Sequence, residues 1–453
     1  MKRFNNLYKY MAGLLLLIGV ACDTLDQEPV NQIAVDGAIT NTRDAQRALQ
    51  GMYDAMQSTN YYGLRYLYYQ DTYTDNLQHA GTFTTDQEVS FRRINPTNLQ
   101  IRSTWQTMYA VIRNANFVIF SLPNITDATP EQLTAYEAEA RFIRALVYYD
   151  LVRVFDGVPL VTNFADNTDN LNLDARASVE EVYSFIIAEL QFAEQNLGNT
   201  PNAPFRARPM AATALLARVY LQAGQNNLAA QKASEVIGGG YTLQPNYRDI
   251  FTVQGNSEMI LELSFTNVDG DQSSLAISSD PATGGQKFYL RSEFYDLFAE
   301  SAAAGDTRFT ASVLQQGARL RVIKYFRSAT NDDNVPLIRL AEMYLIRAEA
   351  NARLAGATGL TTLSILSDIN VIRNRAGLAP LLITDIATAE TALIEILRQR
   401  RFELAFEGHR YSDLRRFGLI GSLFPENEQF RVVWPIPFQE IEVNNSLVQN
   451  PGY

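Results

Sequence analysis

The chain has 453 residues, of which 47% are hydrophobic, enough to bury one large globular core or two of ordinary size. It contains 49 acidic and 38 basic residues, which gives a formal net charge of −11 at pH 7. This balance excludes nucleic acid as the main partner, because neutralising phosphates requires clustered Lys and Arg. It equally excludes electrostatic adhesion to anionic lipid.

The first 21 residues have the pattern of a secretory signal peptide. Lys2, Arg3 and Lys9 form a positively charged start, and an apolar run follows from Met11 to Ala21. That run is shorter than the roughly 20 residues that a membrane-spanning helix needs. The pattern therefore predicts export and removal of residues 1–21.

Cys22 is the only cysteine of the chain, so no internal disulfide can form. Its position directly after the apolar run allows two interpretations, an incidental thiol or the acceptor of a bacterial lipid anchor. Residues 19–22 (GVAC) resemble a lipobox, with Gly19 where leucine is usual, and they favour the anchor. Because each buried CH₂ contributes about 0.8 kcal/mol, several acyl chains would hold the protein stably at a membrane. We therefore predict a lipidated Cys22 at the start of a polar tether over residues 22–38.

Between residues 39 and 237, apolar side chains recur at helical spacing. The first helix is predicted to begin at Asn41 or Thr42, whose side chains are suited to cap it. Further helices are predicted over residues 100–121, 131–155, 179–197, 210–222 and 228–237.

A tyrosine-rich segment over residues 61–73 (YYGLRYLYYQDTY) lies within this series. Tyrosines at helical spacing predict core or interface positions rather than a ligand platform, and Tyr66 and Tyr69 fit that interpretation. Tyr61, Tyr62 and Tyr73 lie near predicted helix ends, where both interpretations stay open.

Residues 75–95 and 238–334 break the helical pattern. The first segment has many small polar residues and is predicted to be a loop. The second opens with three consecutive glycines and contains predicted strands over 259–265 and 319–327. We expect the ligand at this mixed insert together with loop 75–95.

Helical periodicity returns over residues 335–453, with helices predicted over 339–354, 363–375 and 391–406. Paired helices with glycine at the turn, as at Gly224, resemble tetratricopeptide hairpins, which stack into a superhelix with a concave side for a partner. The predicted fold is therefore mainly α. It is a tetratricopeptide-like helical hairpin scaffold, over residues 39–237 and 335–453, with a mixed loop and short-strand insert.

No motif in the sequence predicts catalysis, a metal or a cofactor. The two histidines, His79 and His409, have no neighbours at zinc-ligand spacing, and neither a phosphate-binding glycine loop nor a GxSxG motif is present. Residues 269–271 (DGD) lack the bidentate acid of a calcium loop and predict a turn. A carboxylate pair for glycoside hydrolysis stays open among the 49 acidic residues.

A sugar site needs planar aromatic faces beside polar groups. Trp105 lies on the apolar face of a predicted helix, so it is predicted to be structural, and Trp434 is given a structural role by the family resemblance of residues 431–437 (RVVWPIP). The stacking rings must then be tyrosine or phenylalanine from the two non-helical segments. The candidate ligand contacts are the rings of Phe83, Phe288 and Tyr289 and the polar groups of Gln78, His79 and Arg291.

Charged residues are densest over residues 398–418. Arg400 and Glu403 are three residues apart, as are Glu407 and Arg410, so each pair is predicted to meet on one helix surface. Because buried charges persist only when they are paired, this stretch predicts an ion network that fixes helix packing rather than a catalytic centre.

The same stretch carries a family resemblance. Residues 400–418 (RRFELAFEGHRYSDLRRFG) resemble the C-terminal signature of the SusD/RagB family of surface lipoproteins. Residues 435–453 (PIPFQEIEVNNSLVQNPGY) resemble the ending of that family, and residues 339–350 (RLAEMYLIRAEA) and 369–378 (INVIRNRAGL) resemble its earlier segments. These matches follow one another in family order over the C-terminal third.

The resemblance implies a surface-exposed lipoprotein of a Gram-negative outer membrane with a SusD-like fold. It implies a non-catalytic role as the ligand-capturing lid of a SusC-like TonB-dependent transporter, with oligosaccharides as the favoured ligand. A peptide ligand, as in the RagB branch, and a surface glycoside hydrolase are the alternatives.

Overall fold

The computed structural model describes residues 39–165, 173–198, 204–268, 272–283, 287–356 and 363–453. The predicted signal peptide, Cys22, the tether and residues 269–271 lie outside these ranges. Helices account for 57% of the structure and strands for 6%, which confirms the mainly α fold class.

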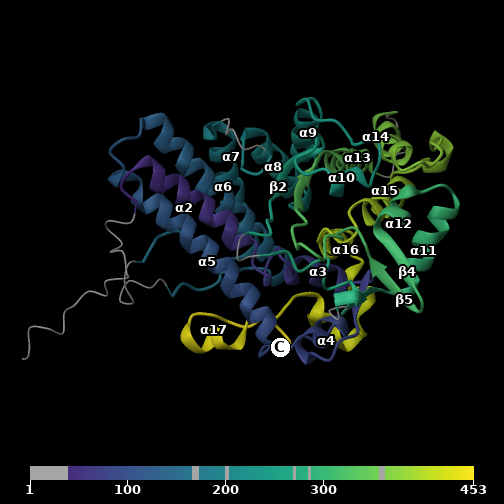
Figure 1. Cartoon of the computed structure of the whole chain (residues 1–453), viewed down its shortest axis with the longest axis horizontal. Helices are drawn as coiled ribbons and strands as arrows, with labels where there is room; N and C mark the ends of the chain where they lie inside the picture. The colour runs from purple at the N-terminus through teal and green to yellow at the C-terminus, as the bar shows by residue number, and fades with distance from the viewer. Residues whose placement is uncertain (1–38, 166–172, 199–203, 269–271, 284–286, 357–362) are drawn as a thin grey trace, which may run out of the picture.

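Helices follow one another along most of the chain (Figure 1). The α-helices are α2 (Thr42–Met56), α3 (Arg65–Thr72), α4 (Thr84–Ser90), α5 (Leu99–Ser121), α6 (Pro130–Phe155), α7 (Val179–Asn196), α8 (Pro209–Gln222), α9 (Asn226–Ile237), α10 (Asp249–Thr252), α11 (Ser292–Ala303), α12 (Thr307–Ser312), α13 (Leu340–Ala355), α14 (Leu363–Arg375), α15 (Ala389–Glu403), α16 (Arg410–Arg416) and α17 (Phe438–Val443). Short 3₁₀ helices are η2 (Leu122–Asn124), η4 (Pro281–Thr283), η6 (Ile383–Ile386), η7 (Ile420–Leu423) and η8 (Glu426–Val432).

The strands described form three separate antiparallel pairs. These pairs are β1 (Leu77–His79) with β3 (Phe288–Leu290), β2 (Met259–Leu263) with β6 (Val335–Arg339), and β4 (Val313–Gln316) with β5 (Arg319–Val322).

The long helices pack as successive neighbours. Figure 1 shows α2, α5, α6 and α7 side by side, and α8 packs between α7 and α9. The order continues through α13, which contacts α9, α14 and α15. This stacking confirms the tetratricopeptide-like scaffold, since each helix buries its apolar stripe against the next.

Local sequence signals set the helix ends. Asn41 caps α2, and its side chain accepts a hydrogen bond from the backbone N–H of Asp44. Thr129 begins α6 and Ser178 begins α7 with reciprocal capping boxes. Such caps satisfy backbone N–H groups that the first helical turn leaves unpaired, so they fix where each helix starts.

The aromatic core matches the prediction for tryptophan and resolves the open tyrosines. Trp105 and Trp434 are buried, as are Tyr61, Tyr62 and Tyr73. Ring contacts join Trp434 to Tyr73 at 6.0 Å between centroids and Tyr61 to Tyr62 at 4.4 Å. The tyrosine-rich segment is therefore core throughout, including the residues at its ends.

Two segments differ from the sequence-based prediction. Residues 75–95 were expected to be loop, yet they contain β1 and α4. Residues 335–339 form β6, which the helical pattern did not predict. Both strands pair with partners far away in the chain, β1 with β3 and β6 with β2, so local periodicity carries no signal for them.

The predicted pairing of charges at residues 398–418 is wrong in detail. Helix α15 ends at Glu403, and positive φ angles at Phe406 (66°) and Gly408 (74°) turn the chain before α16. Glu407 and Arg410 therefore do not share one helix surface, and Glu403, which lies in α15 with Arg400, binds Arg339 at 2.6 Å. Arg400 instead binds Asp413 at 2.9 Å.

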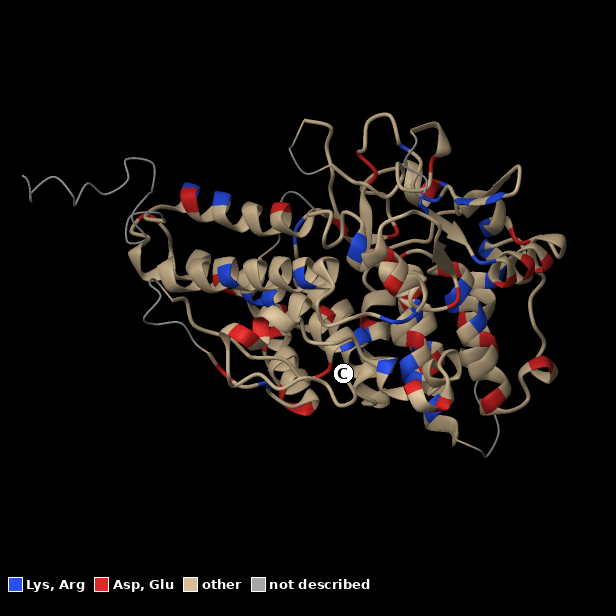
Figure 2. Cartoon of the chain, turned by 90° about the horizontal axis from the view of Figure 1, so that it is seen from below, with Lys and Arg blue, Asp and Glu red and all other residues tan. Residues whose placement is uncertain are grey.

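The ion network itself is confirmed, with partners from distant segments. Glu407 binds Lys324 and Arg339 at 2.8 Å each, and Arg410 binds Asp75 at 2.8 Å. Figure 2 shows acidic and basic residues interleaved over the right-hand half of the molecule, where α11 to α16 lie. The network joins the insert to the C-terminal helices.

Within the described ranges, every helix is too short or too polar to cross a bilayer.

Close backbone contact makes Gly157 a sensitive position. A Cβ atom there would lie 2.2 Å from the carbonyl oxygen of Ala177, a backbone atom that cannot move alone. Gly157→Ala is therefore expected to lower the free energy of unfolding by roughly 1–3 kcal/mol in denaturant titrations. Gly51→Ala is the control, because Gly51 lies within α2 with open space around its Cβ position. That change should instead stabilise the protein by roughly 0.5–1 kcal/mol.

Candidate ligand-binding surface

Strands β1 and β3 bring together the two segments expected to hold the ligand. In their register Gln78 lies opposite Tyr289, and His79 lies opposite Phe288. The pairing continues past β1, where the backbone N–H of Ala80 donates to the carbonyl of Lys287 at 2.8 Å. Residues that are more than 200 positions apart in the chain therefore share one small sheet.

Side-chain alternation divides these residues between two sides of the sheet. Gln78 is exposed and Tyr289 is half-buried on the outer side. His79 and Phe288 point to the inner side, where they are only 6% and 2% exposed, and their rings lie 5.1 Å apart. The structure therefore places His79 and Phe288 beneath the surface, as supports for it.

His79 sits in a closed polar cluster. Its Nε2 lies 3.6 Å from Oδ2 of Asp86, which also accepts a hydrogen bond from the hydroxyl of Tyr69. Burial lowers the pKa of His79, Asp86 opposes that effect, and Lys287 adds to it. The imidazole is therefore neutral at pH 7 and contributes packing rather than charge.

Arg291 also faces inward. Its guanidinium donates to the backbone carbonyls of Ser90 at 2.8 Å and Thr72 at 3.3 Å. Burial, together with the nearby Arg92, lowers the pKa of Arg291 to about 10, so it stays protonated at neutral pH. Its position ties the end of β3 to the segment around β1 and α4.

Two aromatic rings remain on the outer side, and a cationic side chain lies over each of them. Phe83, just before α4, is 55% exposed, and the ammonium of Lys287 lies 4.6 Å from its ring centre. The guanidinium carbon of Arg319, in β5, lies 5.9 Å from the ring centre of Tyr289. We call the surface formed by Gln78, Phe83, Lys287, Tyr289 and Arg319 the binding face.

Lys287 and Arg319 were missed by the sequence analysis. Lys287 lies two residues before Tyr289, so strand alternation places both side chains on one side of β3. This alternation could have identified Lys287 from the sequence, once Tyr289 had been selected as a candidate. Arg319 reaches the binding face only because β5 packs against β3, a contact between strands of different sheets that no sequence pattern marks.

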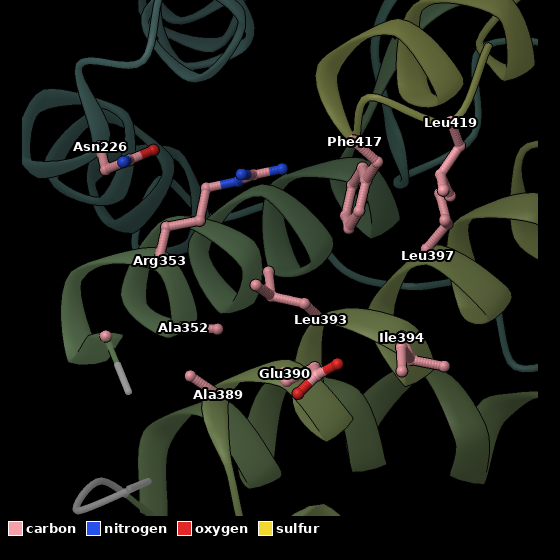
Figure 3. Close-up of a pocket in the computed structure, with 11 residues that line it drawn as sticks. Asn226, Ala352, Arg353, Ala389, Glu390, Leu393, Ile394, Leu397, Phe417 and Leu419 are labelled. Atoms are coloured by element: carbon pink, nitrogen blue, oxygen red, sulfur yellow. The ribbon is translucent and has the colours of Figure 1, made fainter. Parts of the chain in front are cut away.

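An apolar groove of about 870 Å³ lies elsewhere on the molecule (Figure 3). It is lined by residues from α9, α13, α15 and the segment after α16, namely Asn226, Ala352, Arg353, Gly356, Ala389, Glu390, Leu393, Ile394, Leu397, Phe417 and Leu419. Figure 3 shows Leu393 projecting from α15 toward α13, and Leu419 next to Leu397. None of the predicted ligand contacts belongs to this groove.

Throughout the described part of the chain, no cluster of three or more histidine, cysteine, aspartate or glutamate side chains is arranged to hold a metal ion.

Two family models match separate parts of the chain. The model described as "SusD family" matches residues 284–427, and the model described as "Starch-binding associating with outer membrane" matches residues 23–221. The first contains the charged C-terminal stretch and β3, and the second contains β1 and the first helices. Together they cover most of the sequence.

Relatives span the full length. SusD-like protein P2 of Formosa agariphila is 27% identical over 98% of this chain and 99% of its own length. Starch-binding protein SusD of Bacteroides thetaiotaomicron is 29% identical over 76% of each chain. A solved structure of a laminarin binding SusD-like protein superposes with a TM-score of 0.78 and 28% identity, over 92% of this chain and 100% of that one. From the two family matches, these relatives and the common fold, we conclude that the chain belongs to the SusD/RagB family.

Proposed function

We propose that this protein is a cell-surface lipoprotein that captures oligosaccharides and delivers them to a SusC-like TonB-dependent transporter. The binding face is the observation that carries this proposal, since it presents an exposed ring, Phe83, and a half-buried one, Tyr289, beside polar groups, as sugar recognition requires. Relatives described as starch-binding and laminarin binding support the same ligand class.

We propose that different parts of the chain form the scaffold and the ligand-binding side. Residues 39–237 and 335–453 form the scaffold, and residues 238–334 with the segment 75–95 form the ligand side. The scaffold would dock on the transporter while the binding face holds the ligand over its mouth. Release would follow a hinge motion of the whole domain, with no chemistry by this chain.

The proposed location rests on the N-terminus. We propose that residues 1–21 are removed, that Cys22 carries the lipid anchor, and that the tether 22–38 leads to α2. The family model described as associating with the outer membrane begins its match at residue 23, directly after that cysteine, which supports this arrangement.

Mutation of the exposed ring tests the binding face. Phe83→Ala is expected to weaken oligosaccharide binding about tenfold or more, a loss of roughly 1.4 kcal/mol, because the ring offers the face on which a sugar would stack. Isothermal titration against a panel of oligosaccharides and peptides measures it.

Phe438→Ala is the matched control for this titration. Phe438 is 44% exposed on α17, which Figure 1 places away from β4 and β5. If Phe83→Ala binds oligosaccharides as tightly as Phe438→Ala and the wild type do, the binding face does not hold the sugar. Binding of peptides alone would favour the peptide-binding alternative, and release of sugar products would favour the hydrolase.

The apolar groove is the proposed contact for the transporter. Contiguous exposed apolar surface marks protein or ligand contact sites, and Ile394 and Leu419, which line the groove, are 62% and 43% exposed. Ile394→Glu is therefore expected to weaken the transporter complex about tenfold or more, because the interface would have to bury a charge. Quantitative co-purification from membranes measures the loss. Val443→Glu, on the exposed side of α17, should leave the complex intact.

A further inference from the structure

The binding face carries a local excess of positive charge. Lys287 lies 4.6 Å from the ring centre of the exposed Phe83, and Arg319 lies 5.9 Å from that of the half-buried Tyr289. The chain as a whole is acidic, with a net charge of −11. A cationic patch on an acidic protein is therefore a local feature that needs its own explanation.

Strand geometry places a third cation on the same side. Arg319 and Arg321 are two residues apart in β5, so their side chains leave the strand on one side. Gln316 lies opposite Arg319 in the β4–β5 register, and its side chain is uncharged. A row of cations thus extends from Lys287 across Arg319 to Arg321.

Arg321 and Lys287 differ in their acidic neighbours. Asp280 binds Arg321 at 3.1 Å and also accepts a hydrogen bond from the hydroxyl of Ser328 at 2.7 Å, so the charge of Arg321 is paired within the protein. Among the described residues, no carboxylate lies within 4.0 Å of the Lys287 ammonium, which lies over the Phe83 ring. The charge of Lys287 is therefore left for a ligand.

From these contacts we infer that the ligand of the binding face is an anionic oligosaccharide, one that carries carboxylate or sulfate groups on its sugar rings. This inference rests on the proposed function and specifies its ligand class. A sugar ring would lie against the exposed surface of Phe83 or Tyr289. Its acidic group would then meet Lys287 or Arg319, whose positions beside the rings are already set.

The geometry suits both kinds of acidic group. The planar guanidinium of Arg319 can donate two parallel hydrogen bonds to a carboxylate or a sulfate, while the Lys287 ammonium acts as a point charge. Elsewhere the acidic surface repels a polyanion, so the cationic row would also orient the ligand as it approaches. Neutral glucans could accept hydrogen bonds from these cations through their hydroxyl oxygens but would gain no charge–charge attraction.

Titration with matched oligosaccharides tests the inference. The probes are an oligogalacturonate for carboxylate, a sulfated dextran oligomer for sulfate, and maltoheptaose and a laminarin oligomer as neutral sugars. The wild-type protein is expected to bind at least one anionic probe about tenfold or more tightly than the neutral ones, and this preference should shrink as salt is added.

Charge-removing variants locate the preference. The double variant Lys287→Gln/Arg319→Gln should bind the preferred anionic probe about tenfold or more weakly and keep its melting temperature. Arg43→Gln is the matched control, since Arg43 is an exposed arginine of α2. Arg43→Gln should leave both the affinity for the anionic probe and the melting temperature unchanged.

The outcomes separate the inference from the proposed function. Neutral sugars that bind as tightly as the anionic ones, and lose affinity in Phe83→Ala, would overturn the anionic class and leave the proposed function standing. A preference that survives the double variant would also overturn the inference. If no sugar binds, both fail, and tighter binding of poly-glutamate than of any sugar would assign the face to acidic peptides.

Discussion

Replacing Arg339 with methionine is expected to lower the free energy of unfolding by roughly 3–5 kcal/mol. Arg339 is 1% exposed and binds Glu258 at 3.0 Å, Glu403 at 2.6 Å and Glu407 at 2.8 Å. Methionine fills similar space but leaves these buried carboxylates with less positive charge. Removing one partner of a buried ionic network is costly because the remaining charges stay desolvated.

Urea titration measures this loss, and Arg47→Met provides the control. The Arg47 side chain is 71% exposed and lies 3.7 Å from Asp44, so its removal should change stability by less than about 0.5 kcal/mol. Equal stability of Arg339→Met and the wild type would contradict the structural role of the network.

Acid titration gives a second signature of the same network. Burial alone would raise the pKa of Glu403, but the guanidinium groups of Arg375, Arg339 and Arg308 outweigh it and hold that pKa far below its usual range. A lowered carboxyl pKa contributes stability above the unfolded value of about 4, and this contribution is lost as the pH falls. The loss in acid should therefore be smaller in Arg339→Met.

Asp150→Ala is expected to have an effect of similar size, again roughly 3–5 kcal/mol. Asp150 is fully buried in α6 and accepts hydrogen bonds from the hydroxyls of Tyr61 at 2.6 Å and Tyr62 at 2.5 Å. It also pairs with Arg153. Its removal would leave one buried guanidinium and two buried hydroxyls without their main partner.

Thermal and urea unfolding measure this second loss. Asp296→Ala is the control, because Asp296 lies exposed within α11 and alanine has the higher helix propensity. If Asp150→Ala unfolds like the wild type, the tyrosine-rich segment does not depend on this cluster. Asp150→Asn should recover part of the stability, because an amide oxygen still accepts from the tyrosines.

The helical scaffold was predictable because its signals are local. The helix predicted over residues 131–155 is α6, Pro130–Phe155, and the one over 100–121 is α5, Leu99–Ser121. Apolar spacing and capping residues such as Thr129 act within a few turns of the chain. A single sequence is enough to show them.

The remaining contacts depend on distant parts of the chain. β1 exists because β3 pairs with it across the fold, and three residues are too few for their alternation to identify a strand from the sequence. Likewise, the partner of Arg410 is Asp75, far outside its own helix, rather than Glu407. Spacing rules for one helix surface cannot give such pairs.

The candidate site was predicted in part. Gln78, Phe83 and Tyr289 lie on the outer surface as a ligand site requires, and their contact with ligand stays a prediction. His79 and Phe288 occupy the inner side of the same strands. Choosing residues by type and by segment could find the sheet, but only the strand register decides which side chains face outward.

We propose that this chain acts as the ligand-binding lid of an outer-membrane transporter. Purification of the native protein from outer membrane in mild detergent, with identification of the chains that accompany it, tests this role. The account predicts a large barrel transporter in about equal amount. Recovery of the protein alone, even after crosslinking on intact cells, would contradict it and favour a free-standing binding protein or enzyme.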